Sequence, residues 1–114
     1  MRLLNLQLLA LLLVIPSVAM AQDLGEAEAR GFSLVSKHCA SCHAITRSDI
    51  SQHPKAPPLR ILGRRYPVDA LQEALAEGII VGHPDMPEFK FNPDNVGALI
   101  AYLKFVQVPD GGKR

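Results

Sequence analysis

The chain has 114 residues, a formal net charge of +1, and a composition that is 48% hydrophobic and 20% charged. This length is sufficient for one small domain and too short for two. The near-neutral charge balance argues against a nucleic-acid-binding protein, which would carry a surplus of lysine and arginine.

The first twenty-odd residues have the pattern of a secretory signal peptide. Arg2 supplies a positive charge, residues 8–15 form an unbroken apolar run, and Pro16 precedes the small-residue sequence Ala19-Met20-Ala21. This pattern predicts cleavage after Ala21, which divides the chain into a signal peptide, residues 1–21, and one mature domain, residues 22–114. The alternative is an uncleaved membrane anchor, because residues 3–20 almost reach the length that spans a bilayer.

The mature chain begins with a predicted amphipathic helix over residues 24–38. Asp23 is placed to cap its start, and Glu26 and Glu28 suit the positive end of the helix dipole. The residues spaced by three and four along one face are Ala27, Gly31, Leu34, Val35 and His38.

The helix leads directly into Cys39-Ala40-Ser41-Cys42-His43, a C-x-x-C-H motif. Two sulfur nucleophiles three residues apart lie on about the same side of a helical turn. Both can therefore form thioethers to the vinyl groups of one porphyrin, and the histidine that follows can bind the iron as an axial ligand. The motif predicts a covalently attached c-type haem.

Three other interpretations of the two cysteines stay open at this point. A redox dithiol is usually found in a βαβ setting, and no strand pattern surrounds the motif. A structural zinc site needs four ligands, but there is no third cysteine and the other histidines, His38, His53 and His83, are not paired at metal-binding spacing. A disulfide would close only a very small loop, so it would add little stability.

The rest of the chain reads as loops and two further helices. Residues 46–58 are rich in turn-forming residues and predict a loop, whereas residues 67–77 resume helical spacing up to Gly78. The short apolar stretch 79–81 and a proline-rich loop, residues 82–87, follow. The last helix is predicted from Asn92 as N-cap and Pro93 as first residue to about Gln107, before Pro109 and two glycines. Its apolar face contains Val96, Leu99, Ile100, Leu103 and Val106, and no strand alternation appears anywhere, so the domain is predicted to be all-α.

Met86 is the candidate for the second axial ligand of the iron. Met1 and Met20 would be lost with the signal peptide, so Met86 is the single methionine of residues 22–114. A lone methionine more commonly fills a core, but this one lies between Asp85 and Pro87 in a loop, where proline restricts the backbone. His83 and His53 are the alternative ligands. A pair of imidazole and thioether ligands would leave the iron no open position and would raise its reduction potential.

Charged residues are unevenly distributed along the mature chain. Residues 47–65 contain five basic residues and one acidic residue, whereas residues 69–88 contain five acidic residues and no basic one. The basic stretch is either an ordinary solvated surface or a surface that steers a redox partner. Its basic members are Arg47, Lys55, Arg60, Arg64 and Arg65.

Taken together, these motifs resemble the small bacterial class I cytochromes c over residues 22–107. The resemblance includes Gly31 and Val35 before the C-x-x-C-H motif, Ala56-Pro57-Pro58-Leu59, Met86-Pro87-Glu88-Phe89, and residues 99–103. It implies the class I cytochrome c fold, in which the first and last helices cross at Gly31 and Tyr102, the core is centred on haem, and a loop carries the methionine.

The resemblance also implies roles for particular residues. The carbonyl of Pro57 would accept a hydrogen bond from His43, Leu59 and Phe89 would form walls of the haem pocket, and Arg64, Arg65 or Tyr66 would contact the haem propionates.

The function expected from the resemblance is that of a soluble, periplasmic, single-electron carrier and not an enzyme. Its one haem c would be bound through Cys39 and Cys42 and ligated by His43 and Met86. The expected partners are redox proteins, namely a periplasmic dehydrogenase as donor and an oxidase or another cytochrome as acceptor, with no nucleic acid and no stable membrane insertion after signal cleavage. The alternatives are a haem peroxidase or sensor, if Met86 is not a stable ligand, and a non-haem metal or dithiol module.

Overall fold

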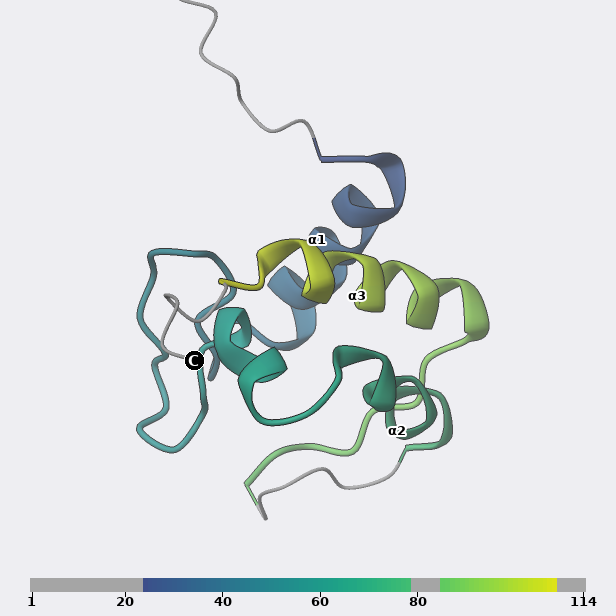
Figure 1. Cartoon of the computed structure of the whole chain (residues 1–114). Helices are drawn as coiled ribbons and strands as arrows, with labels where there is room; N and C mark the ends of the chain where they lie inside the picture. Colours follow the sequence, from purple (N-terminus) through teal and green to yellow (C-terminus); the bar gives the residue numbers. More distant parts are fainter. Residues whose placement is uncertain (1–23, 79–84, 109–114) are drawn as a thin grey trace, which may run out of the picture.

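The computed structural model of the protein describes residues 24–78 and 85–108, and all regular secondary structure in these ranges is helical. The all-α prediction is therefore confirmed for the described residues. Figure 1 shows α3 extending across the middle of the domain, with α1 behind it and α2 below it. The elements in chain order are α1 (Glu26–His38), the 3-10 helices η1 (Leu59–Arg64) and η2 (Val68–Ala70), α2 (Leu71–Glu77) and α3 (Pro93–Val106).

Helix α1 begins two residues later than predicted. Its N-cap is Gly25, which offers no side-chain cap, and the predicted cap Asp23 lies outside the described residues. Glu26 and Glu28 occupy the first turn, where the helix dipole favours negative charge. Ala27, which shares a helix face with Gly31 and Val35 by its spacing, is exposed. The first turn of α1 stands clear of α3 in Figure 1, so burial begins only at Gly31.

Helix α3 forms the centre of the core and agrees with its prediction. The Asn92 side chain accepts a hydrogen bond from the backbone N–H of Asn95 at 2.9 Å, and Pro93 is the first helical residue. All five residues of the predicted apolar face are buried. Ala98 and Tyr102 are buried as well, because α1 packs on their side while η1, η2 and α2 pack elsewhere on α3.

The middle of the chain is more segmented than the sequence indicated. The predicted helix over residues 67–77 is divided into η2 and α2, with Pro67 preceding η2, and Gly78 ends α2 in the left-handed conformation, with φ of 79°. The 3-10 helix η1 was not predicted. It is held by long-range bonds, from the N–H of Leu59 to the carbonyl of Ala44 at 2.9 Å and from the N–H of Gly63 to the Gln107 side chain at 2.8 Å.

The loop between the thiol motif and η1 is braced by one carboxylate. Asp49 accepts hydrogen bonds from the N–H groups of Ile45 and Thr46 and from the Thr46 hydroxyl at 2.7–2.9 Å. Desolvation raises the pKa of Asp49, but these hydrogen bonds outweigh it, so the pKa lies below its ordinary value and the carboxylate stays ionised. Arg60 donates to the carbonyls of Thr46 and Asp49, which ties the same loop to η1.

Several predictions fall on residues outside the described ranges. They are the signal peptide at residues 1–21, the apolar stretch 79–81, His83 and the start of its loop, and the helix-stopping residues from Pro109 onward. Among residues 24–78 and 85–108, none of the helices has both the length and the apolar character that crossing a membrane requires.

Helices α1 and α3 approach each other tightly at Gly31. A Cβ atom added at this residue would overlap the carbonyl oxygen of Ala98 and would lie 2.6 Å from the Cβ of Tyr102. The ring of Phe32 continues this contact, with its centroid 5.4 Å from that of Tyr102. The expected approach of Gly31 to Tyr102 is thus present, and only glycine fits it.

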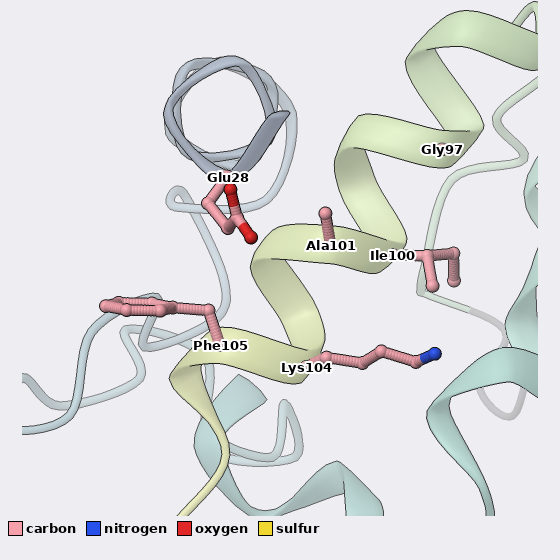
Figure 2. A pocket seen from close by; sticks show the side chains of 6 residues that line it. All are labelled: Glu28, Gly97, Ile100, Ala101, Lys104 and Phe105. Atoms are coloured by element: carbon pink, nitrogen blue, oxygen red, sulfur yellow. The ribbon is translucent and has the colours of Figure 1, made fainter. Parts of the chain in front are cut away.

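Replacing Gly31 by alanine should lower the free energy of unfolding by about 1–3 kcal/mol, because the added methyl group must push α1 away from backbone atoms of α3. The matched control is Gly97→Ala in α3. Gly97 borders an open groove (Figure 2), and an added methyl group there would have no neighbouring atom within 4 Å, so its replacement should be neutral or stabilising. Thermal unfolding of both variants measures the difference, and equal midpoints would contradict the close approach.

Candidate functional site

The site begins where α1 ends and the chain tightens into a turn. Cys39 caps α1 by donating its N–H to the carbonyl of Val35 at 2.8 Å, and its own carbonyl accepts from the N–H groups of Cys42 and His43 at 3.1 and 2.8 Å. These bonds wind residues 39–43 so that both thiols and the imidazole line one cavity. Neither cysteine forms a disulfide. Burial raises the pKa of Cys39 to about 11, so its sulfur is a neutral thiol at pH 7.

The imidazole of His43 is oriented by the backbone of a distant loop. Its Nδ1 lies 2.7 Å from the carbonyl oxygen of Pro57, as the resemblance implied. A carbonyl only accepts, so Nδ1 carries a proton and donates it, and in the neutral ring Nε2 has the lone pair. A histidine in this state is a ready metal ligand, since the hydrogen bond fixes the ring and increases its basicity.

Every described helical element contributes to the walls of this cavity, except η2. The cavity has a volume of about 370 Å³, within the range typical of sites for small molecules and cofactors. Its lining is mostly apolar, with α3 at one wall and η1, α2 and the segment 85–91 at others. The branched aliphatic and aromatic lining residues are Val35, Leu59, Leu62, Tyr66, Leu71, Leu75, Phe89, Phe91, Leu99 and Leu103.

The structure brings nearly all of the sequence-predicted site residues to this cavity. Met86 lines it and is half-buried. Arg64 does not line it, whereas its neighbours Arg65 and Tyr66 do. Of the two arginines considered for the propionates, Arg65 is therefore the one whose position suits that contact. The predicted residues that line the cavity are Cys39, Cys42, His43, Pro57, Leu59, Arg65, Tyr66, Met86 and Phe89.

His53 also lines the cavity, but both of its ring nitrogens have protein partners. Nδ1 accepts a hydrogen bond from the N–H of Lys55 at 3.1 Å, and Nε2 lies 3.6 Å from a carboxylate oxygen of Asp85. Because Nδ1 is an acceptor, the proton of this ring is on Nε2. His53 therefore presents an N–H group rather than a lone pair, the reverse of His43.

Sequence reasoning did not assign His38 and Phe91 to the site. Both line the cavity, and their ring centroids lie 5.2 Å apart in an edge-to-face arrangement. The position of His38 on the inner face of α1, directly before Cys39, was the available signal. Phe91 carried none, because it lies in a stretch without regular structure.

The residues of the cavity fit a c-type haem. Two thiols three residues apart match the two covalent attachment points, and an imidazole with a free Nε2 lone pair and a thioether match the preferred axial ligands of an electron-transfer haem. The apolar and aromatic walls suit a flat apolar macrocycle, while Arg65 and Lys55 provide positive charge at the rim for its carboxylates.

A second hollow on the described surface lacks comparable chemistry. Figure 2 shows an open groove between α1 and α3, with Glu28 extending from α1 and Phe105 at one end. Lys104, at its side, is paired with Asp69 at 2.7 Å. Within residues 24–78 and 85–108 no three or more His, Cys, Asp or Glu residues are gathered as a metal site would require.

Comparison with known proteins gives one family. A family model described as "Cytochrome C oxidase, cbb3-type, subunit III" matches residues 26–103, which is more than half of the chain and includes the whole cavity. No curated protein and no solved structure matches the chain closely enough to count as similar.

Proposed function

The chain belongs to the cytochrome c family described as cytochrome c oxidase, cbb3-type, subunit III, and on this premise we propose that it carries single electrons between redox proteins on one haem c. When bound, the haem supplies an iron that gains and loses one electron. The observation that carries the proposal is that one apolar cavity is lined by Cys39, Cys42, His43 and Met86.

Each of these residues has a distinct role in the proposal. Cys39 and Cys42 attach the porphyrin through thioether bonds. His43 would hold the iron through Nε2, because Nδ1 is committed to the carbonyl of Pro57. Met86 would offer the iron a neutral, soft sulfur, a ligand that favours reduced iron and raises the potential.

Met86 is a better candidate than His53 for the second ligand. The Nε2–H group of His53 is directed to Asp85, so this ring would have to break two interactions and move its proton before it bound a metal. The thioether of Met86 has no proton to lose and lies at the same cavity. With two protein ligands, the iron would have no position for a substrate, so we propose electron transfer rather than peroxidase or sensor activity.

The structure reduces the basic surface that a partner could recognise. Arg47 donates to the carbonyl of Phe105 at 2.6 Å and stacks over its ring, and Arg60 is committed to the braced loop. Lys55, Arg64 and Arg65 are also exposed, like Arg47, but neither Arg47 nor Arg60 lines the cavity. Lys55 and Arg65 lie at the rim of the cavity, so we propose that they steer the chain toward an acidic surface of its partner.

The family description names an oxidase subunit, and an oxidase is therefore the acceptor that we propose. Oxygen uptake by oxidase-containing bacterial membranes, supplied with the reduced protein, tests this function directly. We expect the purified protein to support oxygen uptake with reversible one-electron cycling. A protein that is never oxidised by such membranes, or by any redox partner protein, would contradict the carrier role.

Salt should slow this electron transfer if charge steers the encounter. Between about 0.01 and 0.1 M ionic strength the Debye length falls from about 30 to about 10 Å, so the second-order rate should fall severalfold. The double variant Lys55→Gln, Arg65→Gln should transfer electrons more slowly at low salt. Its rate should also depend less on ionic strength than that of the wild-type protein. Arg30→Gln on α1, outside the cavity, is the control. A flat profile for the wild-type protein would mean that these residues form an ordinary solvated surface.

We also propose that the chain acts in the periplasm, where thioether formation would consume the two thiols before they oxidise. The signal-like pattern of residues 1–21 supports export.

A further inference from the structure

Three aromatic rings connect α1 to the segment that carries Met86. The His38 ring packs edge-to-face against Phe91, with centroids 5.2 Å apart, and against Phe89, with centroids 5.8 Å apart. Phe89 and Phe91 stack on each other at 5.7 Å. Edge-to-face packing places the positive edge of one ring on the negative face of another, so these contacts are directional. We call His38, Phe89 and Phe91 the aromatic cluster.

Among the described residues, the segment from Asp85 to Asn92 has further contacts: Glu88 and Phe89 approach Gly78 at the end of α2, and Asn92 caps α3. It contains no helix or strand, so its backbone is not held by a regular hydrogen-bond ladder. One backbone bond, from the N–H of Phe91 to the carbonyl of Leu75 at 2.8 Å, joins it to α2. At its other end Asp85 pairs with His53 at 3.6 Å. Met86 lies between these attachments, so its place at the cavity depends on them.

We propose that His38 is a positioning residue, which holds Met86 at the cavity by packing against Phe89 and Phe91. The inference rests on the proposed function, because it concerns the residue proposed there as second iron ligand. His38 is suited to this role because it is the last residue of α1 and immediately precedes Cys39. Its backbone is therefore held next to the hydrogen-bonded turn that places the two thiols. The His38 ring thus connects the turn that carries the two cysteines to the segment that carries Met86.

Competition with added imidazole measures how firmly Met86 is held. Imidazole can bind the ferric protein only when Met86 leaves the iron, so its apparent affinity increases with the fraction of protein in which Met86 is detached. His38→Ala removes both edge-to-face contacts and should tighten the apparent imidazole affinity about tenfold, which corresponds to about 1.4 kcal/mol. His38→Phe keeps a flat ring and should stay within about twofold of wild type. Lys37→Ala, an exposed neighbour on α1, is the matched control and should leave the affinity unchanged.

A second pair of variants isolates the effect that passes through Met86. In a Met86→Ala background no methionine competes with imidazole, so adding His38→Ala should cause no further change in affinity. Should His38→Ala fail to fold, Phe89→Leu tests the same contacts from the other side and should also tighten imidazole binding. An unchanged imidazole affinity in both His38→Ala and Phe89→Leu would overturn the positioning role. So would a His38→Phe variant that binds imidazole as tightly as His38→Ala does.

The ferric absorption spectrum, recorded before imidazole is added, separates this inference from the proposed function. A wild-type protein that retains haem and shows the ferric absorption feature of iron-bound methionine supports the function, whatever the His38 variants do. If that feature is present and the His38 variants behave like wild type, the positioning role alone is wrong. If wild-type protein lacks the feature, ligation by Met86 is wrong and the positioning role falls with it.

Discussion

Replacing His43 by alanine should abolish the accumulation of stable haem-containing protein. The expectation follows from two facts of the structure: His43 is held by the Pro57 carbonyl at 2.7 Å, and the cavity around it is walled by apolar side chains from nearly every element. A chain of this size buries too little surface to tolerate an empty centre, so losing the bound group removes the stabilisation that its binding gives to the folded state.

Haem staining of denatured protein on a gel, with circular dichroism of the same preparation, measures this result. His53→Ala is the matched control, because it removes another imidazole from the same cavity, one that presents an N–H group rather than a lone pair. We expect His53→Ala to retain haem and helix content. Wild-type yield of haem protein from His43→Ala would contradict its role as the proximal ligand.

Replacing Met86 by histidine should preserve the fold and lower the reduction potential on the order of hundreds of millivolts, within the roughly 0.8 V range that axial ligands control. The physical reason is that imidazole donates more strongly to oxidised iron than a thioether does, so it stabilises the oxidised state. The half-buried position of Met86 in a segment without regular structure leaves room for the exchange.

Potentiometric titration followed by visible absorption gives the potential of each variant. Lys90→Ala, an exposed residue of the same segment, is the control and should change the potential little. An unchanged potential in Met86→His would show that residue 86 does not bind the iron.

The sequence predicted the parts of the fold that depend on local pattern. Helix α3 was recognised because Asn92, Pro93 and an apolar stripe are all encoded within one stretch. Helix η1 was missed because its cause is remote: Ala44 and Gln107 supply its hydrogen bonds, and its own residues show no period. Ala27 is exposed although it shares the spacing of Gly31 and Val35, because a periodic pattern does not reveal how far along a helix the packing extends.

The site divides in the same way. Cys39, Cys42 and His43 form one local motif, and its spacing alone predicts haem attachment. The Pro57 contact came from the family resemblance, whereas Met86 was proposed because it is the single methionine of residues 22–114 and lies in a loop beside Pro87. The tautomer of His53 and the aromatic cluster needed the tertiary structure, because each depends on contacts between segments far apart in the chain.

The visible absorption spectrum of the purified wild-type protein, recorded in its oxidised and reduced states, tests the central claim most directly. Ligation by His43 and Met86 predicts a low-spin, six-coordinate haem in both states, with the iron–methionine feature in the oxidised spectrum that disappears in Met86→Ala. A five-coordinate or water-ligated oxidised spectrum, or a protein that retains no haem after denaturation, would contradict the account.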